Sequence, residues 1–443
     1  MSPINPWLGI FIVLTLLGAL IGALAWFQKT KQPHPELVRK LLHIGMGLVT
    51  LSFPWLFSSA WPVFVLAALA VIGLLGVKFI KTDSISKVVH GVARESLGEI
   101  YFPISIAIIF ALSHGNLILY IIPVLILTLA DAVAALIGVR YGTIKYTTSD
   151  GVKSTEGSIA FFTMALLATL IPLLLFTEVG RTETLLIALI IATLVMYIEA
   201  LAWKGLDNLF IPLGGFLLLK VYMSMGVPEL TLRLVVILAL FVLSLLYRKR
   251  TTLNDSATMA AVLAGYLVWA AGGWTWFVPP LLMFISYHVL SPKTEENSER
   301  IHDAQAVIAL TLPGMFWLFI AQDQGITELY YPYTVSFAAQ LGMIGLARLH
   351  HQFPDMNRIV LWTRCTVQAG VIILIPWMLI VGLSFSSIAY ASVGVSLVAV
   401  AVVGFYYMQP EIADCPTNNE RFWRQGGVGF VVSLLAGGLV LLV

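Results

Sequence analysis

Charged residues are scarce in this chain. Asp, Glu, Lys and Arg make up 11% of its 443 residues, against about 25% in ordinary soluble domains. Because 59% of the residues are hydrophobic, a soluble fold could not hide the many apolar runs of about 18 to 22 residues. The composition therefore excludes a soluble protein and predicts a polytopic integral membrane protein.

The chain also contains few cysteines and has a small net charge. Cys365 and Cys415 are the chain's two cysteines, too few and too isolated to form a metal-ligand set or a disulfide framework. The net charge is +2, so no dense basic face is available and no nucleic-acid partner is expected.

Apolar runs separated by polar breaks predict an all-α fold with about 15–16 transmembrane helices. The expected spans are approximately 8–26, 42–58, 61–80, 98–113, 117–138, 157–177, 184–203, 208–225, 231–247, 257–272, 275–290, 304–321, 332–347, 366–386, 389–408 and 426–443. The polar stretch 247–256 separates a first module, 1–247, rich in intramembrane polar residues, from a second, 248–443, which is polar mainly in its loops.

Lys and Arg alternate along the connections between these spans. The odd-numbered connections carry most of them, and the even-numbered connections are short or nearly free of them. Under the positive-inside rule this pattern predicts an outside N-terminus and places all odd connections in the cytoplasm.

Asp131 ends an apolar run that contains no other charge. An ionisable residue at such a position is costly unless it has a partner or a function. Gly138 and Gly142 follow it, and a flexible polar loop is expected after them. Their spacing also serves plain helix packing, but an acidic residue about two turns upstream favours close approach of the backbone to a bound phosphate.

The next apolar segment opens with Lys-Ser-Thr-Glu-Gly-Ser at 153–158. An ordinary helix start, with Ser154 or Thr155 as N-cap, is one interpretation. It leaves Lys153 unexplained, and it leaves a glycine inside a helix start. A phosphate seated on the helix N-terminus and neutralised by Lys153 accounts for the whole string. The expected nucleotide contacts are Gly138, Gly142, Lys153, Ser154, Glu156, Gly157 and Ser158.

Three acidic residues lie near predicted cytoplasmic ends of different helices: Asp131, Glu199 and Asp207. Together they would suit one or two Mg²⁺ ions, which favour oxygen donors bridged to substrate phosphates. The alternative for Asp207 is a helix cap. Asn208 offers a further oxygen on the same side.

Two basic motifs lie on the same predicted side. Arg39 and Lys40 are explained equally well by membrane anchoring, which does not explain His43 in an apolar, glycine-rich helix. Arg94 precedes two carboxylates, Glu95 and Glu99, that share one helix face, and a solvated helix start is the alternative there.

At these residues the chain resembles the dolichol kinase/phytol kinase family of integral-membrane, CTP-using lipid kinases, over about 36–226. The resemblance rests on Arg39-Lys40-x-x-His43, Arg94-Glu95-x-x-Gly98, Asp131-x-x-Ala134 with Gly138 and Gly142, Lys153-Ser154-x-Glu156-Gly157-Ser158, and Glu199 with Asp207-Asn208-x-x-Ile211-Pro212. It implies transfer of a nucleotide γ-phosphate to a prenol hydroxyl, with Asp131 holding metal or nucleotide and Lys153 meeting phosphates.

The start of the second module, about 252–321, looks more distantly like the phytyl-phosphate kinase family. This resemblance rests on Leu253-Asn-Asp-Ser256, Ala260-Ala261-Val-Leu-Ala-Gly265 and Gly272-Gly273-x-x-Trp276. The acidic helix expected of that family further on is not evident, since 336–348 has no carboxylate.

The sequence therefore predicts a membrane-embedded prenol kinase that uses Mg²⁺ and CTP (or ATP) at the cytoplasmic face. Its acceptor would be phytol, geranylgeraniol or a dolichol-type polyprenol. Asp131, Lys153 and Glu95 are the expected catalytic residues, and Glu95 or Glu99 is the expected proton acceptor. The expected lipid or phosphate contacts are Arg39, His43, Arg94 and Asn208.

Two other functions stay open. A cytidylyltransferase making a CDP-lipid would share the metal and nucleotide parts but would take a phosphorylated acceptor. A transporter would place its charges at the membrane midplane, whereas the polar residues here gather at one face.

Overall fold

A computed structural model describes residues 4–79, 97–148, 151–247, 253–289, 302–415 and 418–441. The described chain is almost entirely helical, and it divides into two compact units, Met1–Val235 and Val236–Val443.

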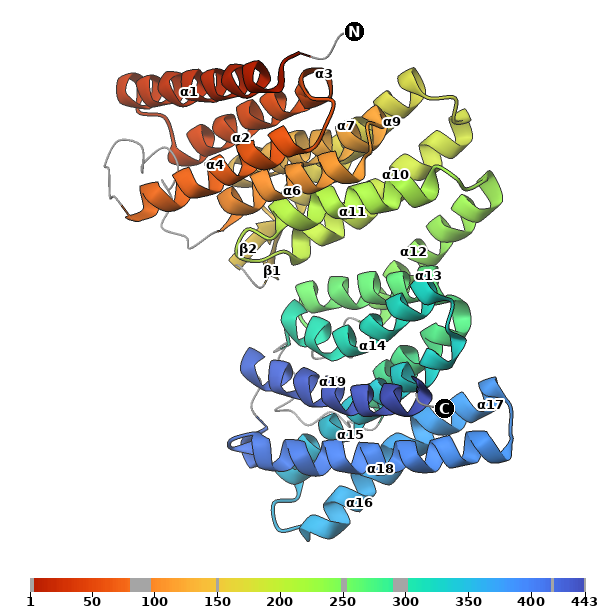
Figure 1. The fold of residues 1–443 in the computed structure, drawn as a ribbon. Coiled ribbons are helices and arrows are strands. Elements are labelled where there is room, and N and C mark those ends of the chain that lie inside the picture. Colours follow the sequence, from red (N-terminus) through yellow and green to blue (C-terminus); the bar gives the residue numbers. More distant parts are fainter. Residues whose placement is uncertain are drawn as a thin grey trace. The chain divides into compact units, whose positions relative to one another are not determined.

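Helices build nearly all of the first unit (Figure 1). They are α1 (Pro6–Lys31), α2 (Pro35–Leu51), α3 (Phe53–Leu56), α4 (Trp61–Phe79), α6 (Gly98–Leu112), α7 (Leu117–Leu125), the π-helical turn η1 (Ile126–Ala130), α8 (Asp131–Tyr141), α9 (Thr155–Phe176), α10 (Arg181–Leu201) and α11 (Asp207–Tyr222). The helix α12 (Val227–Tyr247) runs across the boundary between the units. α9 packs between α8 and α10, and α2 lies against α7, η1 and α8.

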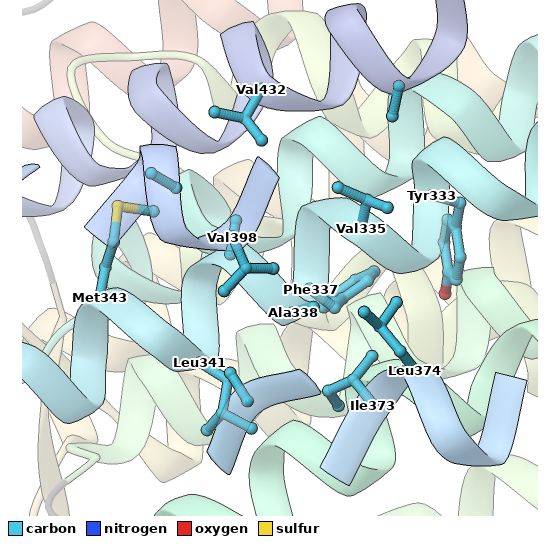
Figure 2. Packing of buried hydrophobic residues seen from close by; sticks show 14 of the residues in the cluster. Tyr333, Val335, Phe337, Ala338, Leu341, Met343, Ile373, Leu374, Val398 and Val432 are labelled. Atoms are coloured by element: carbon cyan, nitrogen blue, oxygen red, sulfur yellow. The ribbon is translucent and has the colours of Figure 1, made fainter. Parts of the chain in front are cut away.

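The second unit is also helical. Its elements are α13 (Asp255–Val289), α14 (Ala304–Gln324), η3 (Thr327–Leu329), α15 (Tyr330–Gln352), α16 (Arg358–Ala369), η4 (Gly370–Leu374), α17 (Ile375–Val381), α18 (Phe385–Met408), η5 (Ile412–Asp414) and α19 (Asn419–Leu441). α15 lies at the centre of this unit, since nearly every residue from Tyr330 to Ala347 is buried. Figure 2 shows part of the core around it, including Phe337 of α15 and Val398 of α18.

Ten helices in the described part of the chain are long and apolar enough to span a membrane, and two shorter apolar helices accompany them. This confirms an all-α, polytopic membrane protein. Each predicted apolar run overlaps helical structure, although 42–58 covers the end of α2 and α3, and 366–386 covers the end of α16, η4 and α17. The runs 257–272 and 275–290 are the two halves of α13, which bends at Gly273, where φ is +73°.

A β-hairpin interrupts the helices between α8 and α9. Strand β1 (Lys145–Thr148) pairs antiparallel with β2 (Gly151–Ser154), with Tyr146 opposite Lys153. The prediction of a flexible polar loop was wrong here. Tyr and Thr, which β1 contains, and Val, which β2 contains, are common in strands. The hairpin gives Lys153 a defined position.

Candidate functional site

The glycines around the hairpin let α8 and α9 approach each other closely. A Cβ added at Gly142 would lie 2.3 Å from the Gly138 carbonyl oxygen and 2.6 Å from Ser154 Cβ. One at Gly157 would lie 3.1 Å from the Ala134 carbonyl oxygen. Protein atoms therefore occupy the space beside these glycines, which gives them a packing role. Their contact with a nucleotide stays a prediction.

Polar side chains at the start of α9 hold the chain locally. Ser154 Oγ accepts a hydrogen bond of 3.2 Å from the Gly157 amide, which confirms Ser154 as the N-cap. Glu156 Oε1 accepts from the backbone amides of Thr143 and Ile144, at 3.0 and 3.2 Å. Ser158 Oγ lies 2.7 Å from the hydroxyl of Tyr146 in β1. These residues fix the hairpin to the helix, and their other predicted contacts are untested.

Lys153 reaches from β2 to the end of α10. Its ammonium donates to Glu199 Oε1 at 2.6 Å and also to the Glu199 backbone carbonyl. Burial alone would lower the pKa of Lys153. The carboxylates of Glu199 and, further away, Asp207 outweigh that effect and raise the pKa above its ordinary value. Lys153 is therefore a fixed positive charge at the end of two helices.

Asp131 lies in a second charged group, formed with α2. It follows the π-helical turn η1, a distortion often found at functional sites. Lys40 Nζ donates to Asp131 Oδ2 at 2.7 Å, and both side chains are largely buried. His43 Nε2 lies 3.6 Å from the same oxygen and 3.0 Å from the Leu127 carbonyl oxygen in η1. Since a carbonyl can only accept, Nε2 carries the hydrogen of that bond.

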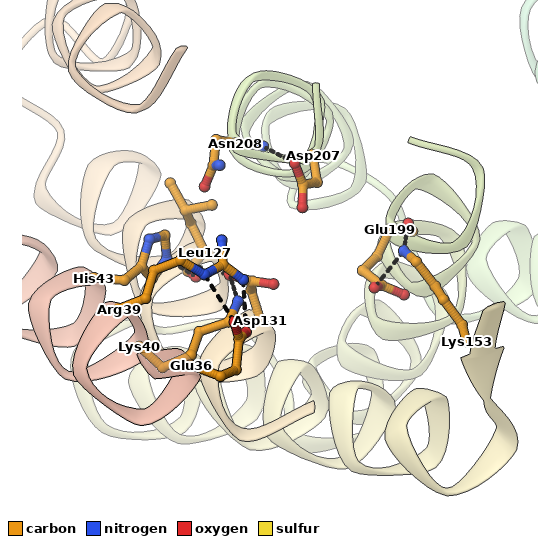
Figure 3. Close-up of polar contacts among 10 residues, drawn as sticks. All are labelled: Glu36, Arg39, Lys40, His43, Leu127, Asp131, Lys153, Glu199, Asp207 and Asn208. Carbon is orange, nitrogen blue, oxygen red and sulfur yellow. Dashed lines mark hydrogen bonds and ion pairs between the residues drawn. The ribbon is translucent and has the colours of Figure 1, made fainter. Parts of the chain in front are cut away.

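Arg39 extends this group along α2. Its guanidinium forms two hydrogen bonds to Glu36, of 2.6 and 3.1 Å. Bidentate pairing of this kind fixes the orientation of the guanidinium. Four residues of α2 thus gather around Asp131: Glu36, Arg39, Lys40 and His43 (Figure 3).

Asp207 and Asn208 begin α11 and lie between the two charged groups in Figure 3. The Asp207 charge acts on Arg39 on one side and on Lys153 on the other. Asp207 Oδ1 accepts a hydrogen bond of 3.1 Å from the backbone N–H of Asn208. Asn208 Oδ1 is buried and has no hydrogen-bond partner, an unfavourable state for a polar atom. This pair links the Lys153 side of the site to the Asp131 side.

The predicted three-carboxylate metal site does not fit this arrangement. Lys40 neutralises Asp131 and Lys153 neutralises Glu199. Among the described residues, no three His, Cys, Asp or Glu side chains converge closely enough to hold a metal. Asp207 and Asn208 still offer oxygens. They fit a Mg²⁺ ion that brings nucleotide phosphates as its other ligands, because Mg²⁺ needs only one or two protein carboxylates in such sites.

Two predicted site residues, Arg94 and Glu95, lie outside the described residues. Sequence reasoning assigned no site role to Lys40 or Glu36, although Lys40 belongs to the motif Arg39-Lys40-x-x-His43 that carries the resemblance. The spacing held a signal, since Lys40 and His43 are three residues apart and so share one helix face. The remaining predicted residues of the charged groups come together in space from segments far apart in the sequence.

Comparison with known proteins gives one informative relative. The chain is 28% identical over 215 residues to a protein from Synechocystis sp. named phytol kinase, and the alignment covers 48% of this chain and 90% of that protein. No protein-family model matches the chain. No solved structure matches it either.

Proposed function

We propose that this protein is a lipid-alcohol kinase that transfers the γ-phosphate of CTP or ATP to a membrane-dissolved prenol such as phytol, geranylgeraniol or dolichol. The observation that carries the proposal is the likeness to a phytol kinase over 90% of that protein's length. The two lysine–carboxylate pairs of the first unit support it, because such charges are costly in a membrane protein without a function.

Phosphoryl transfer needs positioning and charge stabilisation more than covalent chemistry from the protein. Lys153 suits the nucleotide phosphates, because its ammonium is held in place by Glu199 and stays charged. Asp207 and the partnerless Asn208 Oδ1 would hold Mg²⁺, which neutralises phosphate charge when it is bound with the nucleotide.

The second charged group suits the acceptor alcohol. Lys40 occupies Asp131 Oδ2, which leaves Oδ1 to orient the prenol hydroxyl. The hydroxyl oxygen bonds to the γ-phosphorus, the bond from that phosphorus to the leaving nucleoside diphosphate breaks, and the hydroxyl proton passes to a carboxylate. Asp131 is the proposed acceptor among the described residues, and Glu95 remains a candidate for the same proton.

Transfer of label tests this function. Purified protein receives Mg²⁺, CTP or ATP labelled at the γ-phosphate, and a panel of prenols. We expect a labelled lipid phosphate that falls by about 100-fold or more in Asp131→Asn and Lys153→Met, the loss typical when one charge-stabilising group is removed. Lys145→Met, an exposed lysine of the same hairpin, is the matched control and should retain activity.

The same assay can overturn the proposal. A lipid product labelled from the α-phosphate of CTP, with a phosphorylated lipid as acceptor, would make the protein a cytidylyltransferase. Activity that persists in both variants would remove the assigned roles of Asp131 and Lys153.

A further inference from the structure

The second unit contains a pocket that the proposed kinase site does not use. It lies between the C-terminal halves of α15 and α16, with Ser286 of α13 on one side. The sequence places 348–364 among the basic stretches predicted to face the cytoplasm. Arg348 and Arg364 lie at the two ends of this stretch, so the basic end of the pocket is expected near the boundary between membrane and water.

Basic and hydrogen-bonding side chains line the polar part of this pocket. Arg348 comes from α15 and Arg364 from α16, and the carboxamides of Gln352 and Gln368 accompany them. None of the described residues that line the pocket is acidic. Arginine is the side chain best suited to phosphate, because its planar guanidinium donates two parallel hydrogen bonds.

Apolar residues line the rest of the pocket. Leu341, Ile344 and Leu349 contribute from α15, and Gly345 adds no side chain. A Cβ added at Gly345 would lie 3.7 Å from Cys365 Sγ, another lining atom. This is an ordinary van der Waals distance, so a larger side chain at this position would extend into the pocket from this wall.

The size of the pocket limits its ligand. Its volume is about 100 Å³, whereas pockets for drug-sized ligands measure about 300–1,000 Å³. A nucleotide is too large for it. A single tetrahedral phosphate group, comparable to a few water molecules of about 30 Å³ each, has a suitable size.

We propose that this pocket binds a phosphate group, either free or as the headgroup of a membrane lipid. Arg364 neutralises the phosphate oxygens, the glutamines and Ser286 complete their hydrogen bonds, and the apolar wall contacts the carbon next to the headgroup. The site belongs to the second unit alone, so it does not rest on the kinase function proposed for the first.

Direct binding tests the inference with the full-length protein in detergent, without nucleotide. Titrations use inorganic phosphate, phosphatidic acid in mixed micelles, and diacylglycerol as a lipid without phosphate. We expect saturable binding of phosphatidic acid and none of diacylglycerol. Competition by millimolar phosphate would identify a site open to the free anion, and its absence would identify a lipid headgroup site.

Two variants tie the binding to this pocket. Arg364→Gln removes one positive charge, and Gly345→Leu fills the space while leaving the charges in place. Each should weaken phosphatidic acid binding by about tenfold or more. Arg358→Gln, on the same helix but outside the pocket, is the matched control and should bind as the parent does. Unchanged binding in both pocket variants, or equal binding of diacylglycerol, would overturn the inference.

Discussion

Lys40 and Asp131 form a buried ion pair of 2.7 Å that joins α2 to α8. Removing one member of a buried pair leaves the other charge without compensation, which costs about 3–5 kcal/mol. Lys40→Met is therefore expected to lower the free energy of unfolding in detergent by about that amount. Lys145→Met provides the control for loss of an exposed lysine.

Replacing both members separates the ion pair from the rest of the packing. Lys40→Met combined with Asp131→Leu should recover much of the lost stability, because an apolar pair replaces two buried charges. It should also abolish lipid phosphorylation. A single Lys40→Met variant as stable as the parent would show that the pair contributes little.

Lys153 gives a prediction for pH. Its pKa in the folded protein is raised above the ordinary value of 10.5. A group with a raised pKa contributes stability that is fully present below its ordinary pKa and is lost as pH rises through the folded value. The difference in Tm between the parent and Lys153→Met should therefore be constant from about pH 7 to about pH 10 and shrink above that. A difference that already shrinks near pH 8 would contradict the raised pKa.

At the scale of the elements, the contact between α8 and α9 depends on glycine. Gly142→Ala would place a methyl group 2.3 Å from the Gly138 carbonyl oxygen, and overpacking of this kind costs about 1–3 kcal/mol. We expect a lower Tm and reduced activity, because the hairpin that carries Lys153 would shift. Gly76→Ala in α4, with no neighbour within 4 Å of the added carbon, is the control. Equal stability of the two variants would argue against the packing role.

The helices could be predicted from the sequence because long apolar runs in a membrane protein leave few alternatives to a helix. The hairpin could not be predicted with the same rule, since it depends on a few local residues between two spans. The two charged groups were predicted only in part. Lys40 pairs with a residue 91 positions away, and a single sequence does not show which acidic residue a basic one meets.

Metal binding illustrates the same limit. Asp131, Glu199 and Asp207 share a predicted membrane side, which suggested a common metal site. Sharing a side does not bring carboxylates within ligand distance of one ion. The structure pairs the first two with lysines instead.

At the scale of the whole molecule, the predicted orientation can be tested by labelling. α7, η1 and α8 form one continuous helical span, Leu117–Tyr141, with His114 before it and Thr147 after it. At 1.5 Å per residue such a span crosses the roughly 30 Å hydrocarbon core. In a variant without the two native cysteines, a membrane-impermeant thiol reagent added outside should label His114→Cys and spare Thr147→Cys. The reverse pattern would invert the predicted topology.

The hairpin also sets a depth. A two-stranded sheet has open edges, whose N–H and C=O groups find no partners in lipid, so β1 and β2 lie at the level of water. Because Lys153 of β2 donates a hydrogen bond to Glu199, the end of α10 lies at the same depth as the hairpin. A prenol must therefore bring its hydroxyl up to this level while its tail stays in the bilayer. We expect prenols that differ only far from the hydroxyl to react at similar rates, so that the reacting end decides which alcohols are accepted.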